Sequence, residues 1–226
     1  MKKTSFALAL LATMFLLLFT ACTHPAVPTA PETALAFPGA QWNMTPEQLI
    51  QALHLKEGEY QASENPYEES ADASRPSGSY SIQVTNMEVF GKNGQVGFRF
   101  YDFTGSGRYG LVYIVVEYPE DTDMQAVKAA MIKAYGEPSP YDSDHNDPDY
   151  KKHVTVWYSE VTQYDVLSQK QIQALTGDML EAIRERPLTY VFWSDEAERA
   201  LIGTRESPNG LSFHCTLNEM LNWEIG

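Results

Sequence analysis

Three strand-like runs follow one another in the middle of the chain, and they constrain the fold more than any other feature. They span residues 80–90, 95–103 and 109–118, are rich in Val, Ile, Tyr and Phe, and contain stretches of alternating apolar and polar residues. That alternation is typical of strands with one buried face. The first two runs are joined by Gly91-Lys92-Asn93-Gly94, which predicts a hairpin turn. The sequence therefore predicts an antiparallel sheet that other elements must cover on one face.

Helix signals lie on both sides of these runs. Thr45 and Gln48 have the spacing of a capping box, and Pro46 suits the first helical position, so we expect a helix from here to about residue 55. After the strands, the acidic cluster at 121–123 is expected to cap a second helix, which ends at Gly136. Its apolar stripe consists of Met124, Val127, Met131 and Tyr135. The acidic stretch from 56 to 79, which Pro and Gly interrupt, is interpreted as a long loop.

The second half of the chain repeats the order of one helix and three strands. A helix is expected from 168 to 186, and its apolar stripe consists of Ile172, Leu175, Met179 and Ile183. Strands are expected at 153–158, 188–194, 199–204 and 211–215, followed by a short helix after Thr216. We therefore predict an α+β fold, an antiparallel β-sheet with helices packed on one face. Whether the two α-βββ units, 42–138 and 139–226, form one domain stays open.

The first 22 residues have the parts of a secretory signal. Lys2 and Lys3 precede an uncharged, largely apolar run from Phe6 to Phe19, which is shorter than the about 20 residues of a membrane span. Phe19-Thr20-Ala21-Cys22 resembles the lipobox of bacterial lipoproteins. This resemblance implies that residues 1–21 are a signal peptide and that Cys22 carries lipid after cleavage. An ordinary signal peptide and an uncleaved anchor helix are the alternatives.

A tether is expected after Cys22. Residues 22–41 are rich in Pro, Thr and Ala, a composition that favours extended polyproline conformations and does not bury a core. The resemblance to the lipobox implies that the protein lies outside the cytoplasm and that its lipid attaches it to a bacterial membrane. Cys215 is then the one remaining thiol, so we expect no intramolecular disulfide and interpret Cys215 as a small buried apolar residue.

The charge of the chain excludes some partners. The sequence has 16 Lys and Arg against 30 Asp and Glu, a net charge of −14, which becomes −16 when the signal peptide removes Lys2 and Lys3. An acidic surface of this kind repels phosphate backbones and anionic headgroups. We therefore expect no binding to nucleic acid and assign membrane attachment to the lipid.

Patterns for metals, cofactors and catalysis are sparse. Asp142, Asp144 and Asn146 match the start of a calcium loop, but Asp147 occupies the glycine position and His153 that of the bidentate Glu. These three residues are weak candidates for irregular calcium binding, and we expect no metal or other cofactor. The histidines lack zinc-site spacing, and the chain lacks a G-x-S-x-G elbow. Most aromatic residues are expected in the core, among them Tyr113, Tyr118, Trp157, Tyr190 and Trp193.

A second resemblance concerns the predicted first helix. Residues 42–49, Trp-Asn-Met-Thr-Pro-Glu-Gln-Leu, resemble the G-M-T-x-E-x-V helix start of small lipoprotein modules. These modules are grouped with β-lactamase inhibitor protein and the SmpA/OmlA outer-membrane assembly lipoproteins. The resemblance implies an α+β module that binds other proteins, and it implies no particular functional residues.

Three hypotheses about function follow. The first is a lipid-anchored extracytoplasmic binding module for a protein or a cell-envelope component. The second is a hydrolase inhibitor or envelope-assembly factor, for which a concave sheet face with exposed aromatic residues is expected. The third is a glycan-directed enzyme that uses paired carboxylates in a cleft.

Overall fold

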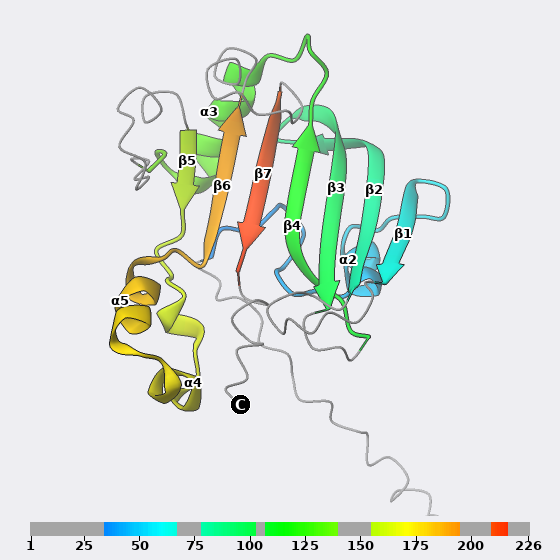
Figure 1. Ribbon diagram of the computed structural model, residues 1–226. Coiled ribbons are helices and arrows are strands. Elements are labelled where there is room, and N and C mark those ends of the chain that lie inside the picture. Colours follow the sequence, from blue (N-terminus) through cyan, green and yellow to red (C-terminus); the bar gives the residue numbers. More distant parts are fainter. Residues whose placement is uncertain (1–33, 67–77, 103–106, 140–154, 195–208, 217–226) are drawn as a thin grey trace, which may run out of the picture.

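The computed structural model describes residues 34–66, 78–102, 107–139, 155–194 and 209–216 (Figure 1). The strands are β1 (Tyr60–Pro66), β2 (Gly78–Val89), β3 (Lys92–Asp102), β4 (Gly110–Glu117), β5 (Thr155–Tyr158), β6 (Thr189–Ser194) and β7 (Gly210–Cys215). The helices are α2 (Pro46–Ala52), α3 (Met124–Tyr135), the 3₁₀ helix η2 (Tyr164–Val166), α4 (Gln169–Ala174) and α5 (Gly177–Glu185). The strand expected at 199–204 and the helix expected after Thr216 lie outside the described residues.

These strands form one antiparallel sheet in the order β1-β2-β3-β4-β7-β6-β5 (Figure 1). Strands β1 to β4 form one meander and β5 to β7 a second. The last strands of the two meanders, β4 and β7, pair with each other and place Ile114 opposite Phe213. Both predicted α-βββ units therefore contribute to a single sheet.

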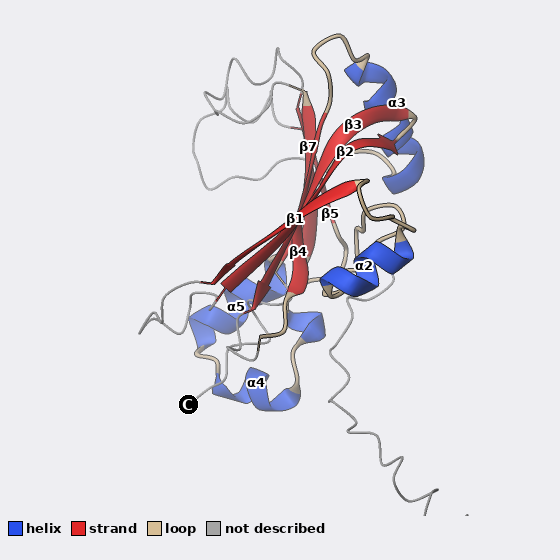
Figure 2. Cartoon of the chain, turned by 90° about the vertical axis from the view of Figure 1, so that its right-hand side faces the viewer, coloured by secondary structure: helices blue, strands red, loops and turns tan. Residues whose placement is uncertain are grey.

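One face of this sheet carries the hydrophobic core. Six residues on six neighbouring strands lie opposite one another and form a row, here called the core row. Each of them is at most 1% exposed: Ile82, Phe98, Ile114, Phe213, Val191 and Trp157. Helices α2 and α3 lie on one side of the sheet (Figure 2), and the ring of Tyr135 on α3 contacts that of Phe213 with centroids 6.4 Å apart. The predicted α+β fold, an antiparallel sheet with helices packed on one face, is confirmed.

The helix caps form as the sequence predicts. Thr45 Oγ1 accepts a hydrogen bond from the backbone N–H of Gln48 at 3.4 Å, and Gln48 Oε1 accepts one from the backbone N–H of Thr45 at 2.9 Å. These reciprocal bonds are those of a capping box. At α3, Asp123 Oδ1 accepts from the backbone N–H of Ala126 at 3.1 Å. Helix α3 ends at Gly136, whose φ of 84° suits glycine because it has no Cβ.

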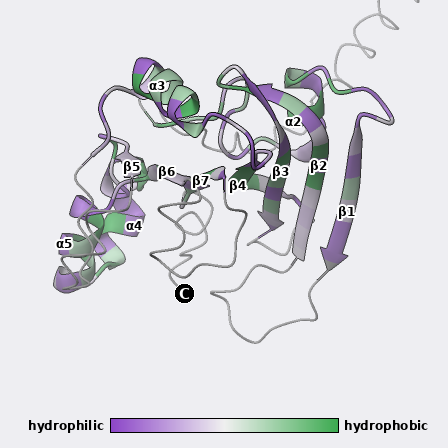
Figure 3. Ribbon diagram, turned by 90° about the horizontal axis from the view of Figure 1, so that it is seen from above, coloured by the Kyte–Doolittle hydropathy of each residue, from purple (hydrophilic) through white to green (hydrophobic). Residues whose placement is uncertain are grey.

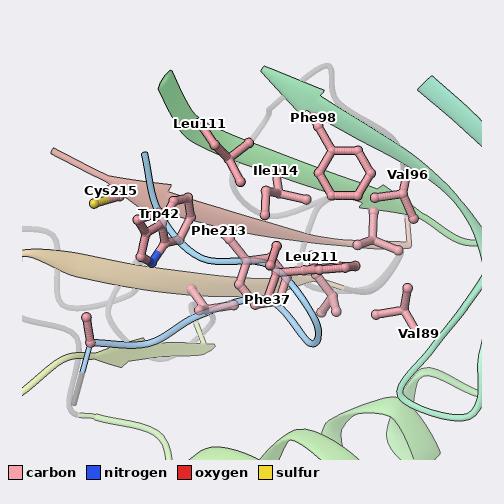
Figure 4. Close-up of a cluster of buried hydrophobic side chains, with 14 of the residues drawn as sticks. Phe37, Trp42, Val89, Val96, Phe98, Leu111, Ile114, Leu211, Phe213 and Cys215 are labelled. Atoms are coloured by element: carbon pink, nitrogen blue, oxygen red, sulfur yellow. The ribbon is translucent and has the colours of Figure 1, made fainter. Parts of the chain in front are cut away.

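The folded part begins earlier than the sequence predicts, because residues 34–41 belong to the core and not to the tether. Phe37 is 3% exposed, and its ring contacts the rings of Phe98 and Phe213 edge-on with centroids 5.5 Å apart in both pairs (Figure 4). This geometry is favourable for aromatic pairs. Residues 34–41, most of which are apolar, therefore form an irregular core segment.

Hydrogen bonds fix the chain near the start of this segment and directly after its end. The backbone N–H of Leu35 donates to Thr189 Oγ1 at 2.9 Å, at the start of β6. The carbonyl of Leu35 accepts from Trp42 Nε1 at 2.6 Å, and the backbone N–H of Asn43 donates to the carbonyl of Leu111 on β4 at 2.9 Å. The segment thus joins the two halves of the sheet.

Strand β1 lies inside the stretch interpreted as a loop, so that interpretation is wrong for residues 60–66. Strand β1 pairs antiparallel with β2 and places Ser63 opposite Ser81. Its side chains from Gln61 to Asn65 are exposed, and its ribbon is mostly hydrophilic (Figure 3). Because an exposed edge strand buries little on either face, the alternating pattern that reveals other strands is missing.

The helix expected from 168 to 186 is two helices, and they lie beyond one end of the sheet (Figure 1). Leu175 and Thr176 have extended backbones between α4 and α5. Thr176 takes the conformation of an N-cap, and Gly177 is unfavourable inside a helix, so the break is local in origin. The stripe of four apolar residues was expected to pack on the sheet, and this expectation is wrong for Met179, which is 42% exposed, whereas Ile183 is 1% exposed.

This difference in burial gives a test within one helix. Ile183→Ala is expected to lower the free energy of unfolding by about 2 to 5 kcal/mol, because it leaves a cavity in the core. Met179→Ala is the matched control and is expected to change it by less than about 0.5 kcal/mol. Urea unfolding of the two variants measures the difference. Equal losses would contradict the placement of α5.

Candidate binding surface

The sheet face opposite the core row carries a second row of side chains, here called the cross-strand row. It consists of Arg99, Tyr113, His214, Tyr190 and Tyr158, on β3, β4, β7, β6 and β5. Each lies opposite the next in the strand register. Each also directly precedes or follows a core-row residue in the chain, and neighbouring strand residues point to opposite faces. The strands that bury the core row therefore present the cross-strand row on the other side.

The members of the cross-strand row contact one another in sequence. The Arg99 guanidinium carbon lies 5.5 Å from the centroid of the Tyr113 ring. The Tyr113 and His214 rings meet edge-on at 4.6 Å, and His214 stacks on Tyr190 at 4.5 Å with an interplanar angle of 16°. The Tyr158 and Tyr190 centroids are 6.4 Å apart. The result is a continuous line of flat groups across five neighbouring strands.

His214 is at the centre of this line. Burial among the rings lowers its pKa from 6.5 to about 4, because the charged imidazolium loses hydration there. Its Nε2 lies 3.2 Å from Ser212 Oγ on the same strand. His214 is therefore uncharged at neutral pH, and Arg99 is the one charged member of the row.

Small polar side chains and the ring of Phe192 lie beside the row, and the Phe192 centroid is 5.3 Å from that of Tyr190 and 6.0 Å from that of His214. Its register continues through Ser81 on β2 to Ser63 on β1. Arg99 and Ser63 are exposed, while the row's Tyr and His rings and Ser81 are partly buried. Such a surface combines flat apolar ring area with hydroxyl and guanidinium groups that form hydrogen bonds.

The sequence did not predict this row as a site. Tyr113 and Tyr190 were expected in the core, whereas both are partly buried on the opposite face. Tyr118, Trp157 and Trp193 are buried as expected. The alternation of residues within each strand indicates which side chains share a face of the sheet. The alignment of the rings from one strand to the next depends on the β4–β7 pairing, which joins distant parts of the chain.

The residues that the sequence singled out lie elsewhere. Cys22, Asp142, Asp144 and Asn146 are outside the described residues. Cys215 is buried, as predicted, and lies on the core face next to His214 on the opposite face. Within the described ranges, no cluster of three or more His, Cys, Asp or Glu side chains could hold a metal ion.

Two further findings concern the chain as a whole. Of the helices that the structure describes, none is long and apolar enough to cross a membrane. Comparisons with protein families, with curated proteins and with solved structures found no match for this chain.

Proposed function

We propose that this chain is a lipid-anchored extracytoplasmic binding module that presents the cross-strand row to a protein or another component of the cell envelope. The observation that carries the proposal is the line of contacting flat groups from Arg99 to Tyr158. Tyr and Arg are enriched among side chains that dominate binding energy, because they offer large contact area together with hydrogen-bonding groups. Proposed lipidation at Cys22 holds this surface near the membrane.

The role of the row is tested by crosslinking in cells. A photoreactive amino acid in place of Tyr158 is expected to capture one dominant partner from the envelope. The same amino acid in place of Gln173, an exposed residue of α4, is the control and is expected to capture none. Equal products from both positions, or none from Tyr158, would contradict binding at the row.

The anchor is tested separately with a palmitate analogue. Labelling is expected in the wild-type protein and is expected to be lost in Cys22→Ser, because the thiol is the attachment point. Labelling that persists in this variant, or a mature amino terminus elsewhere, would refute lipidation at Cys22. Neither result depends on the crosslinking experiment.

A further inference from the structure

Strand β1 forms an open edge of the sheet (Figure 1). It pairs with β2 in an unbroken register over all seven of its residues, Tyr60–Pro66. Within the described parts of the chain, no strand pairs with β1 on its other side. The opposite edge of the sheet differs, because β5 forms a further bridge there between Val156 and Ser139. Strand β1 is therefore the edge at which another strand can be added.

The backbone groups of β1 alternate in direction, as they do in every antiparallel pair. The carbonyl of Ser63 accepts a hydrogen bond from Ser81 Oγ at 3.5 Å, so this carbonyl faces β2. The N–H and C=O groups of Ala62 and Glu64 therefore point away from β2. Pro66 follows the same alternation, and proline is tolerated on an edge strand where its missing N–H would face outward. The outward side of β1 is thus a row of donors and acceptors that bind no group of the described chain.

The features that block strand addition in other proteins are weak on β1. Edge strands are commonly protected by bulges, by lysines or by a covering element. Across residues 60–66 the register has no bulge, and the sequence has no Lys. The side chains from Gln61 to Asn65 are exposed. The one charged side chain, Glu64, is held by Tyr109, whose hydroxyl donates to Glu64 Oε1 at 2.7 Å. An incoming strand can therefore reach the outward backbone groups.

The two faces of β1 determine which side chains an incoming strand needs. On the core face, Ala62 lies opposite Ile82 and continues the core row, so a small apolar residue suits the position beside it. Glu64 is two residues further on and shares this face. The other face carries only polar side chains: Gln61, Ser63 and Asn65. The incoming strand should therefore alternate, with polar residues on one face and an apolar residue next to a partner for Glu64 on the other.

The charge at this edge is negative. Residues 56–66 contain one Lys against three Glu. Burial raises the pKa of the Tyr80 hydroxyl, and the carboxylates of Glu47 and Glu64 raise it further, so both carboxylates lie close to Tyr80 on β2. Pairing with β1 of a second copy would bring two such edges together, which their like charges oppose. A strand with Lys or Arg side chains is favoured instead.

From these observations we infer that the outward edge of β1 binds an extended segment of a partner protein, with basic residues on the face that meets Glu64. The segment adds a further strand to the sheet. In binding of this kind, main-chain hydrogen bonds provide affinity and the alternating side chains provide specificity. The inference goes beyond the proposed function, because it concerns the backbone of β1 and not the rings of the cross-strand row.

The experiment uses the Cys22→Ser protein, expressed without its signal peptide, and a synthetic peptide as the probe. The peptide is Thr-Lys-Thr-Val-Thr-Lys-Thr with blocked ends, whose symmetric sequence offers Val to Ala62 and Lys to Glu64 in either direction. Calorimetry is expected to show binding, and hydrogen exchange is expected to slow at the amides of Ala62 and Glu64. The control peptide has Glu in place of both Lys residues and is expected not to bind.

Variants of the protein separate the backbone contacts from the charge. Ala62→Pro removes the outward N–H and is expected to weaken peptide binding about tenfold or more, because the hydrogen-bonding partner on the peptide is left unpaired. Ala62→Ser keeps this N–H and is the matched control. Glu64→Gln is expected to weaken binding severalfold, whereas Glu181→Gln removes an exposed carboxylate of α5 and is expected to change nothing. Circular dichroism of each variant separates a loss of binding from a loss of fold.

Several results would overturn the inference. Equal binding by wild type and Ala62→Pro would place the peptide elsewhere, and equal binding of the two peptides would refute a basic partner. Dimerisation that Ala62→Pro abolishes would assign the edge to a second copy of the chain. Absence of binding to the Lys peptide would also refute the inference. A dominant product from the crosslinker at position 158 would support the proposed function even then, so the two failures are distinguishable.

Discussion

Phe37→Ala is expected to lower the free energy of unfolding by about 3 to 5 kcal/mol, the range for truncating a buried aromatic side chain. Phe37 is 3% exposed and meets the rings of Phe98 and Phe213, which belong to different meanders of the sheet. Its loss therefore leaves a cavity where the two halves join. Urea unfolding, followed by circular dichroism, measures the change.

Gln41→Ala provides the control for this prediction, because Gln41 is an exposed residue of the same segment. It is expected to change stability by less than about 0.5 kcal/mol. A small loss at Phe37, similar to that at Gln41, would show that the segment contributes little to the core and that the tether extends further than we find.

The second large effect is a loss of stability in acid that depends on His214. Its pKa in the folded protein is about 4, below the 6.5 of an unfolded chain. Between these values the unfolded chain binds a proton and the folded chain does not. Stability is therefore complete above pH 6.5, falls as the pH decreases towards 4, and loses about 3 kcal/mol in total from this group.

His214→Gln isolates this contribution from that of the many carboxylates. The glutamine is uncharged and keeps a hydrogen-bonding group near Ser212. The difference in unfolding free energy between wild type and variant is expected to change across pH 6.5 to 4 and to be constant above that range. A difference that does not vary with pH would mean that His214 is as well hydrated in the folded protein as in the unfolded chain.

The elements that could be predicted from the sequence are those whose local residue pattern matches the burial of their side chains in the fold. Strands β2, β3 and β4 each bury one face, and their alternation reveals them. The starts of α2 and α3 depend on side chains within one turn, at Thr45 and Asp123. In each case, neighbouring residues contain the whole signal.

The missed elements depend on distant parts of the chain. Residues 34–41 have no regular period, and only the space between Phe98 and Phe213 makes Phe37 a core residue. Strand β1 is polar because it lies at the edge of the sheet. The stripe from 168 to 186 matches a single helix, but the backbone is extended at Leu175 and Thr176, between the end of α4 and the start of α5.

The candidate site was beyond prediction for the same reason. Tyr113 and His214 are about a hundred residues apart in the sequence, and they meet because β4 pairs with β7. Either residue alone is an ordinary strand residue. Their contact follows from a pairing register that no local pattern specifies.

The segment that begins at Ala34 also determines how the protein responds to mechanical force. Leu35 bonds to β6 at Thr189, Ala36 accepts a hydrogen bond of 2.8 Å from Tyr135 on α3, and Phe37 packs against the centre of the sheet. Because these residues are consecutive, a force that pulls on the chain before Ala34, such as tension on the proposed lipid anchor, would load all three contacts nearly together. A pull strong enough to extract the segment would uncover Phe98 and Phe213, so extraction of the segment and unfolding of the core would be one event.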